Sequence, residues 1–171
     1  MKKTIISVVV ALVLVLALSS CSLLDEAVKN IIKGDVTGEL NTSYSTQWFD
    51  FTVKSIKSGY TYGDCDADDG WKFVVVRVSE TNTFSEPIPM GIFDFYLEAE
   101  GLAEEDSWPL SPLEGSEDTM MPDEFELDID ETAEYDVVFI IPDEITEISF
   151  IYEEYDEDGN IGVTFTINHT L

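Results

Sequence analysis

The chain is poor in the residues from which common catalytic centres are built. Its 171 residues contain one histidine, His169, and two cysteines, Cys21 and Cys65. His169 stands close to the C-terminus, and no serine or cysteine lies in a recognisable nucleophile motif. We therefore expect no enzyme activity and no catalytic residue. A hydrolase is the weaker alternative, and it requires that His169 or a carboxylate pair lie in a concave site.

Basic residues are also scarce. The 8 lysines and arginines face 36 aspartates and glutamates, which gives a formal net charge of −28. The few cations are scattered singly, whereas a nucleic-acid-binding protein needs a basic stripe to neutralise phosphates. The composition therefore excludes a nucleic acid partner. Anionic membrane surfaces should repel the chain as well, so any membrane attachment has to come from another source.

Long helical periods are missing from residue 47 onward, where apolar residues instead alternate with polar ones. Alternating β-branched and aromatic residues are typical of strands. Six segments show this pattern: Phe49 to Val53, Lys72 to Val78, Phe93 to Leu97, Tyr135 to Ile141, Ile148 to Tyr152 and Ile161 to Ile167. Two weaker segments, Ser107 to Leu110 and Phe125 to Ile129, should be edge strands. We expect an all-β, antiparallel sandwich of about seven to eight strands.

The turn at Asp158-Gly159 joins two of the strongest alternating runs. Aspartate followed by glycine suits a type I′ turn, which needs positive φ at both of its central positions. We therefore expect the last two strands to form an antiparallel hairpin.

The first 21 residues have the order of an export signal. Lys2 and Lys3 precede an apolar run over residues 5–18 that is too short to span a membrane comfortably. The following Leu18-Ser19-Ser20-Cys21 resembles the lipobox of bacterial lipoproteins. This resemblance implies that residues 1–20 are a cleaved signal peptide and that the Cys21 thiol carries a diacylglycerol. Because two acyl chains give stable anchoring, we expect a cell-membrane protein that faces the extracellular side, or the periplasm in a host with an outer membrane.

Residues 21–46 connect the expected anchor to the folded domain. Apolar residues from Leu23 to Ile32 fall three and four apart, which predicts a short amphipathic helix or a partly ordered tether. Glycine and small polar residues over 34–46 indicate a linker. This leaves residues 47–171 as one folded domain.

Cys65 has no disulfide partner within the chain once Cys21 carries lipid. It stands between Asp64 and Asp66, whose negative charges disfavour a thiolate. An inert thiol is therefore expected.

Three strand patterns in the domain resemble a known family. They are Asp69-Gly70-Trp71-Lys72-Phe73 leading to Thr81-Asn82-Thr83, Phe93 to Leu97 ending at Glu100-Gly101, and Asp136 to Pro142. Together they are similar to the telokin-like, immunoglobulin-like extracellular domains of many Gram-positive lipoproteins. The resemblance covers about residues 47–168 and implies an immunoglobulin-like β-sandwich. That family has no agreed molecular function, so the resemblance implies no ligand.

An acidic loop over residues 64–70 is the sharpest candidate for a metal site. Asp64, Asp66, Asp68 and Asp69 gather carboxylates before Gly70, and hard cations such as calcium prefer several oxygen ligands. The spacing does not fit an EF-hand, and aspartate and glycine are also common in plain turns between strands. Calcium therefore stays an alternative, in a calcium-stabilised structural module or an accessory subunit of an envelope complex.

Aromatic side chains are the other candidate for binding. Trp48 lies on the polar phase of its strand, and Trp71 starts a strand beside the acidic loop, so neither is placed like a core residue. The wider set of candidates for an exposed platform comprises Trp108, Tyr44, Tyr60, Tyr62, Tyr152 and Tyr155. Exposed aromatic rings are favourable contacts for glycans and proteins. We expect a surface binding module for an extracellular protein or glycan, with Trp48 and Trp71 in its binding surface.

Overall fold

The structure is a computed structural model that describes residues 34–155 and 159–171. The expected signal peptide, the lipidation site Cys21 and the predicted helix over residues 23–32 lie outside the described residues. Within the described ranges, no helix has the length and apolar character needed to cross a membrane.

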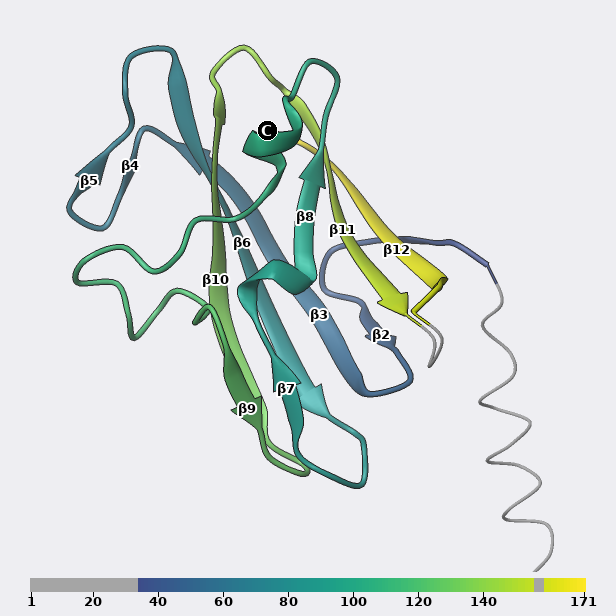
Figure 1. The fold of residues 1–171 in the computed structure, drawn as a ribbon. Coiled ribbons are helices and arrows are strands. Elements are labelled where there is room, and N and C mark those ends of the chain that lie inside the picture. Colours follow the sequence, from purple (N-terminus) through teal and green to yellow (C-terminus); the bar gives the residue numbers. More distant parts are fainter. Residues whose placement is uncertain (1–33, 156–158) are drawn as a thin grey trace, which may run out of the picture. The chain divides into compact units, whose positions relative to one another are not determined.

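Two four-stranded sheets pack face to face as a sandwich (Figure 1). The first, here the β3 sheet, has the strand order β10-β6-β3-β2, and the second, the β11 sheet, has the order β1-β12-β11-β8. The strands of these sheets are β1 (Val36–Gly38), β2 (Ser43–Ser45), β3 (Phe49–Gly59), β6 (Trp71–Asn82), β8 (Phe95–Glu98), β10 (Thr132–Pro142), β11 (Glu147–Tyr155) and β12 (Ile161–Thr170). The predicted all-β sandwich is confirmed.

Two short antiparallel strand pairs complete the fold. One joins β4 (Thr61–Tyr62) to β5 (Cys65–Asp66), and the other joins β7 (Ile88–Met90) to β9 (Phe125–Leu127). Figure 1 shows these pairs at opposite ends of the sandwich. The strand predicted around Phe125 is confirmed by β9, but Ser107 to Leu110 is not a strand.

The core lies between the sheets and follows the predicted alternation. From the β3 sheet, Phe49, Phe51 and Val53 point inward together with Val74, Val76 and Val78 of β6. The β11 sheet contributes the inward residues of β11 and β12, which are Ile148, Phe150, Tyr152, Val163, Phe165 and Ile167. Burial of each such side chain stabilises the fold by about 1.5–3 kcal/mol. The antiparallel pairing of β11 with β12 also confirms the predicted final hairpin.

The predicted linker over residues 34–46 is wrong, because this segment belongs to the sandwich. β1 pairs in parallel with β12, and β2 pairs antiparallel with β3. Both strands are only three residues long, which is too short for an alternation to be recognised in the sequence. Gly38 lets the Tyr44 ring approach the backbone of β1 closely, since a Cβ atom at this position would lie 2.8 Å from Tyr44 Cζ and the ring would have to shift.

The predicted strand from Phe93 to Leu97 begins later than expected. Residues Ile92–Asp94 form a short 3₁₀ helix, η1, and the strand β8 starts at Phe95. The Gly91 backbone N–H donates a 2.9 Å hydrogen bond to the Asp94 carboxylate, which closes this turn. As a result Ile92 is buried and Phe93, expected on the core side with Phe95, faces outward.

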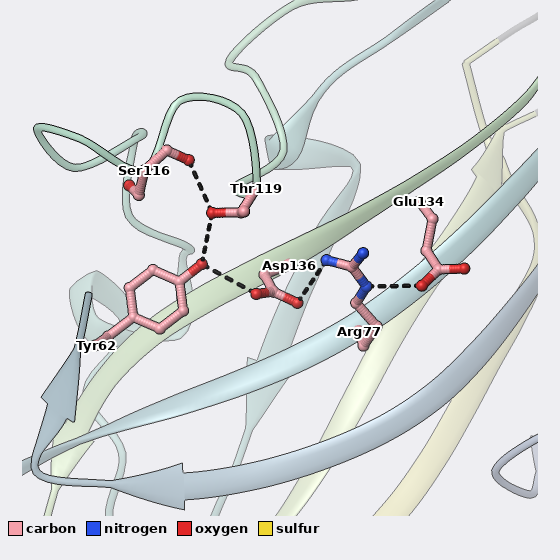
Figure 2. A network of polar contacts seen from close by, with 6 residues as sticks. All are labelled: Tyr62, Arg77, Ser116, Thr119, Glu134 and Asp136. Atoms are coloured by element: carbon pink, nitrogen blue, oxygen red, sulfur yellow. Dashed lines mark hydrogen bonds and ion pairs between the residues drawn. The ribbon is translucent and has the colours of Figure 1, made fainter.

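A polar network ties the loop after η2 (Glu104–Ser107) to the outer face of the β3 sheet (Figure 2). The Tyr62 hydroxyl donates a 3.0 Å hydrogen bond to Asp136, and Arg77 forms ion pairs with Glu134 and Asp136. Thr119 lies 3.4 Å from the same hydroxyl. In the described part of the chain the two ion pairs of Arg77 are the only ones. The single described arginine is therefore paired with carboxylates of this network.

Candidate binding site

The two tryptophans predicted for a binding surface lie far apart. Trp71 begins β6, whereas Trp48 lies beside the end of that strand, where its carbonyl accepts a hydrogen bond from Thr83. A strand of 12 residues separates its ends by about 36 Å, at about 3.3 Å per residue. Trp48 and Trp71 therefore cannot contact one small ligand together, and each has to be judged by its own surroundings.

Trp48 lines a hollow of about 260 Å³, here named the Trp48 hollow. Its aromatic wall consists of Trp48, Phe93, Tyr96, Trp108, Tyr152 and Tyr155. Three of these, Phe93, Trp108 and Tyr155, are 52%, 45% and 51% exposed and belong to the six exposed large apolar side chains of the described chain. Exposed aromatic surface concentrated in one concave place is the kind of surface that ligands and partner proteins contact.

A tight turn holds Trp48 at the rim of the sandwich. The Thr46 hydroxyl oxygen accepts hydrogen bonds from the backbone N–H groups of Trp48 and Phe49, at 3.1 and 3.0 Å. The Trp48 ring packs edge-on against Phe84, with ring centroids 4.8 Å apart. This turn explains the departure from strand phase that the sequence showed, because Trp48 precedes β3.

Trp108 reaches the same hollow from the segment that follows η2. Its ring centroid lies 5.7 Å from that of Tyr96 on β8. Trp108, Tyr152 and Tyr155 belonged to the wider aromatic set predicted from the sequence. Phe93 and Tyr96 were not in that set. Alternation alone assigned Phe93 to the core.

Glu153 forms the centre of a tyrosine-carboxylate cluster in the hollow. Tyr96 and Tyr155 each donate a 2.8 Å hydrogen bond to it, to Oε1 and Oε2 respectively. Burial and this hydrogen bond raise the pKa of Tyr96, and the hydrogen bond to Glu153 raises the pKa of Tyr155. Both phenols therefore stay protonated and act as donors to Glu153.

Asp94 adds a second carboxylate to the wall. Although its side chain reaches solvent, the surrounding protein desolvates it and raises its pKa, an effect that the hydrogen bond from Gly91 partly offsets. None of the described basic residues lines the hollow. Arg77 is engaged elsewhere, and the Lys72 ammonium group donates to the backbone carbonyls of Asp143 and Ile145.

Glu80 lies in the protein interior behind this wall. It continues the inward-facing positions of β6 after Val78, is 1% exposed, and neither carboxyl oxygen has a hydrogen-bond partner. Burial and the nearby charge of Asp94 raise the pKa of Glu80 to about 8. Glu80 in turn contributes to the raised pKa of Tyr152, whose main cause is burial. An unpartnered buried carboxyl with a perturbed pKa, beside an open hollow, is typical of a functional site.

A second hollow of about 370 Å³ adjoins the first and shares Trp48, Asp94 and Tyr152 with it. Its remaining wall is largely apolar and includes Phe84, Ile88 and Met90. The two hollows together offer a charged aromatic compartment next to an apolar one.

The acidic loop does not assemble into a metal site. Asp64, Asp66, Asp68 and Asp69 are all exposed, and no group of three or more His, Cys, Asp or Glu side chains in residues 34–155 and 159–171 could hold a metal ion. Calcium requires a cage of several oxygens at short range, and these exposed carboxylates do not form one. Calcium binding there stays a prediction without support from this geometry.

His169 lines a third, larger hollow of about 800 Å³ at the other end of β11. Glutamates surround it, among them Glu98 and Glu147, and Ser149 is also present. The Ser149 hydroxyl, however, is hydrogen-bonded to Asn168 at 2.8 Å rather than to His169. The concave setting that the hydrolase alternative requires is present, but a serine-histidine pair is not formed.

Comparison with known proteins shows likeness at the level of the fold. No protein family and no curated protein matches the chain. Among solved structures, the Bacillus subtilis protein ycdA, described as a candidate lipoprotein, superposes with a TM-score of 0.57 and 15% identity over 75% of this chain. The match covers 38% of ycdA, so this chain spans well under half of that protein.

Two further solved structures are similar over most of their length. The yjhA protein from Bacillus subtilis has a TM-score of 0.53 and 12% identity, with 77% of this chain and 98% of that chain covered. An uncharacterized β-sandwich protein from Clostridium difficile 630 has a TM-score of 0.49 and 12% identity, with 81% and 95% covered. At such low identity the likeness to ycdA and yjhA shows a shared sandwich fold and no shared activity.

Proposed function

We propose that this chain is a lipid-anchored surface protein whose β-sandwich binds an extracellular partner without catalysis. The observation that carries the proposal is the Trp48 hollow, where three exposed aromatic side chains and two carboxylates converge on one small concavity. A soluble protein gains nothing in stability by leaving such rings exposed, whereas a ligand that covers them gains contact area.

The proposed anchor is the diacylglyceryl group on Cys21. Its support is the lipobox-like Leu18-Ser19-Ser20-Cys21 after a signal-like apolar run, together with the fold shared with ycdA, itself described as a candidate lipoprotein. A chain with a net charge of −28 is not attracted to an anionic membrane, so a lipid is the physically suitable anchor. The sandwich would then face the extracellular side, where proteins and glycans of the envelope are accessible.

A capture experiment tests the binding function. The full chain, purified in a non-ionic detergent, is immobilised and exposed to envelope extract beside the variants Trp48→Ala, Trp108→Ala and Trp71→Ala. We expect the first two variants to lose the same bound partners and Trp71→Ala to keep them. If all four proteins capture identical material, the Trp48 hollow is not the binding site.

A further inference from the structure

The chemistry of the Trp48 hollow specifies the kind of group that it can bind. We propose, on the basis of the binding function above, that it takes a quaternary ammonium group, as found in choline.

The rings provide the main attraction. Trp48, Trp108 and Tyr96 line a space of about 260 Å³, and the face of an aromatic ring is the negative part of its quadrupole. A cation within about 6 Å of such a ring is attracted, most strongly by tryptophan, and this attraction grows when water is excluded. A ring of aromatic side chains around a small concavity therefore selects a compact cation with an apolar surface.

The carboxylates make this selection stronger. Glu153 and Asp94 bring negative charge to the wall, and neither forms an ion pair within the described ranges, where the ion pairs belong to Arg77. An anionic or neutral ligand would leave that charge uncompensated in a partly desolvated place, whereas a cation compensates it.

The hydrogen bonds decide between kinds of cation. A primary ammonium group such as that of lysine has three N–H donors and needs acceptors for them. In this hollow each oxygen of Glu153 already accepts one tyrosine hydroxyl, and Oδ2 of Asp94 accepts the Gly91 N–H, so fewer acceptor positions remain for a ligand. A quaternary ammonium group donates no hydrogen bond, so it gains the charge and the ring contacts without depending on the acceptor positions that remain.

Glu80 is an independent sign that this end of the sandwich is built for more than stability. Its carboxyl is buried without partners next to Asp94 and Tyr152, both of which line the hollow. An apolar residue would fill the same core position at lower cost. A cation bound in the hollow favours the ionised form of Glu80, because the two opposite charges attract each other. Ionised Glu80 in turn strengthens the attraction of the hollow for the cation.

Isothermal titration calorimetry tests the proposal with three small probes. Choline chloride, its neutral isostere 3,3-dimethylbutan-1-ol and n-butylammonium chloride are titrated into the full chain in a maltoside detergent, which carries no choline group. We expect choline to bind, and the neutral isostere to bind about tenfold more weakly or not at all, because it lacks the cation–π term. Butylammonium, a mimic of the lysine side chain, should also bind more weakly than choline.

Variants locate the binding. Trp108→Ala and Glu153→Gln should each weaken choline binding by about tenfold, while Trp71→Ala, about 36 Å away along β6, should leave it within twofold. Glu153→Gln keeps the shape of the side chain, so it remains informative if Trp108→Ala unfolds the protein, which circular dichroism would reveal.

Each contrary outcome overturns a different statement. Equal binding of choline and its neutral isostere would show an apolar site without cation selectivity, and stronger binding of butylammonium would point to lysine side chains instead. No binding of choline, with capture from envelope extract still dependent on Trp48 and Trp108, would overturn the ammonium proposal and leave the binding function standing. No binding and no dependent capture would overturn both.

Discussion

The Tyr96 hydroxyl donates a 2.8 Å hydrogen bond to Oε1 of Glu153 across the pairing of β8 with β11. The two residues are 57 positions apart in the sequence. They meet because the edge strand β8 pairs with β11 in the sheet. It fixes one tyrosine ring in the wall of the Trp48 hollow and occupies a carboxylate oxygen at the same time. The selectivity proposed for the hollow depends on that occupied oxygen.

Removing the hydroxyl should change which cation is preferred. In Tyr96→Phe the ring remains but Oε1 of Glu153 loses its tyrosine donor, which leaves one more acceptor position for a ligand. We expect the affinity for n-butylammonium to rise relative to choline by severalfold, measured by competition calorimetry. Tyr62→Phe, which removes a hydroxyl bound to Asp136 away from the hollow, is the matched control and should leave the ratio unchanged. A ratio that does not move in Tyr96→Phe would contradict the role given to the Glu153 oxygens.

Glu80 should make the stability of the protein fall as the pH rises. Its folded pKa is raised from 4.5 to about 8, so the folded state holds a proton that the unfolded state releases between these values. The contribution of protonated Glu80 to the free energy of unfolding is therefore fully present below about pH 4.5 and is lost as the pH rises through 8. The difference is on the order of 4–5 kcal/mol, at 1.36 kcal/mol for each pKa unit. The raised pKa values of Asp94 and Glu154 act in the same direction.

The variant Glu80→Gln separates this effect from the general repulsion among acidic residues. It removes the titrating group and keeps its shape, so we expect the free energy of unfolding to depend much less on pH and to exceed that of the parent at pH 9. Urea unfolding at pH 5, 7 and 9 measures both proteins. Parallel pH profiles for parent and variant would show that Glu80 does not titrate in this way.

Gly91 should tolerate no larger side chain. A Cβ atom there would lie 2.5 Å from the Asp123 backbone oxygen, and backbone cannot move aside as a flexible side chain does. We expect Gly91→Ala to destabilise the fold by about 1–3 kcal/mol and to weaken choline binding, since the Gly91 N–H holds Asp94 in place. Gly59→Ala, where the nearest atom would be 3.9 Å away, is the matched control for thermal unfolding and should change neither property as much.

The lipid anchor should depend on Cys21 alone. Expressed in a bacterial host, the parent chain should gain the mass of a diacylglyceryl group and lose residues 1–20, as seen by intact mass spectrometry. Cys21→Ala should show neither change, and Cys65→Ala, the matched control at the other cysteine, should show both. Lipid on Cys21→Ala, or none on the parent, would contradict the proposed anchoring.

The sequence allowed the main strands of the sandwich to be predicted because a buried sheet face imposes a period of two. Phe49, Phe51 and Val53 show it plainly, and the structure buries all three. β1 and β2 were not predicted because strands of three residues are too short to display a period. The helix η1 was not predicted because the Gly91 to Asp94 hydrogen bond closes a local turn inside an alternating run. Local pattern therefore predicts long strands well and short pairing segments poorly.

The candidate site was predictable only in part. Trp48 was recognisable by its departure from strand phase, and Glu80 could have been found as an acid on the inward phase of β6 after Val74, Val76 and Val78. The partnership of Tyr96 with Glu153, and the meeting of Trp108 with Trp48, depend on which strands become neighbours. No local pattern contains that information, so only the folded arrangement reveals the hollow.

The most direct test of the account uses the indole signals of the protein. The chain has three tryptophans, Trp48, Trp71 and Trp108, so a ¹⁵N-labelled sample gives three indole N–H resonances, which single substitutions assign. During a titration with choline we predict that the resonances of Trp48 and Trp108 shift together along one binding curve and that the Trp71 resonance stays in place. No shift of Trp48 and Trp108, or an equal shift of all three, would contradict a single cation site in the Trp48 hollow.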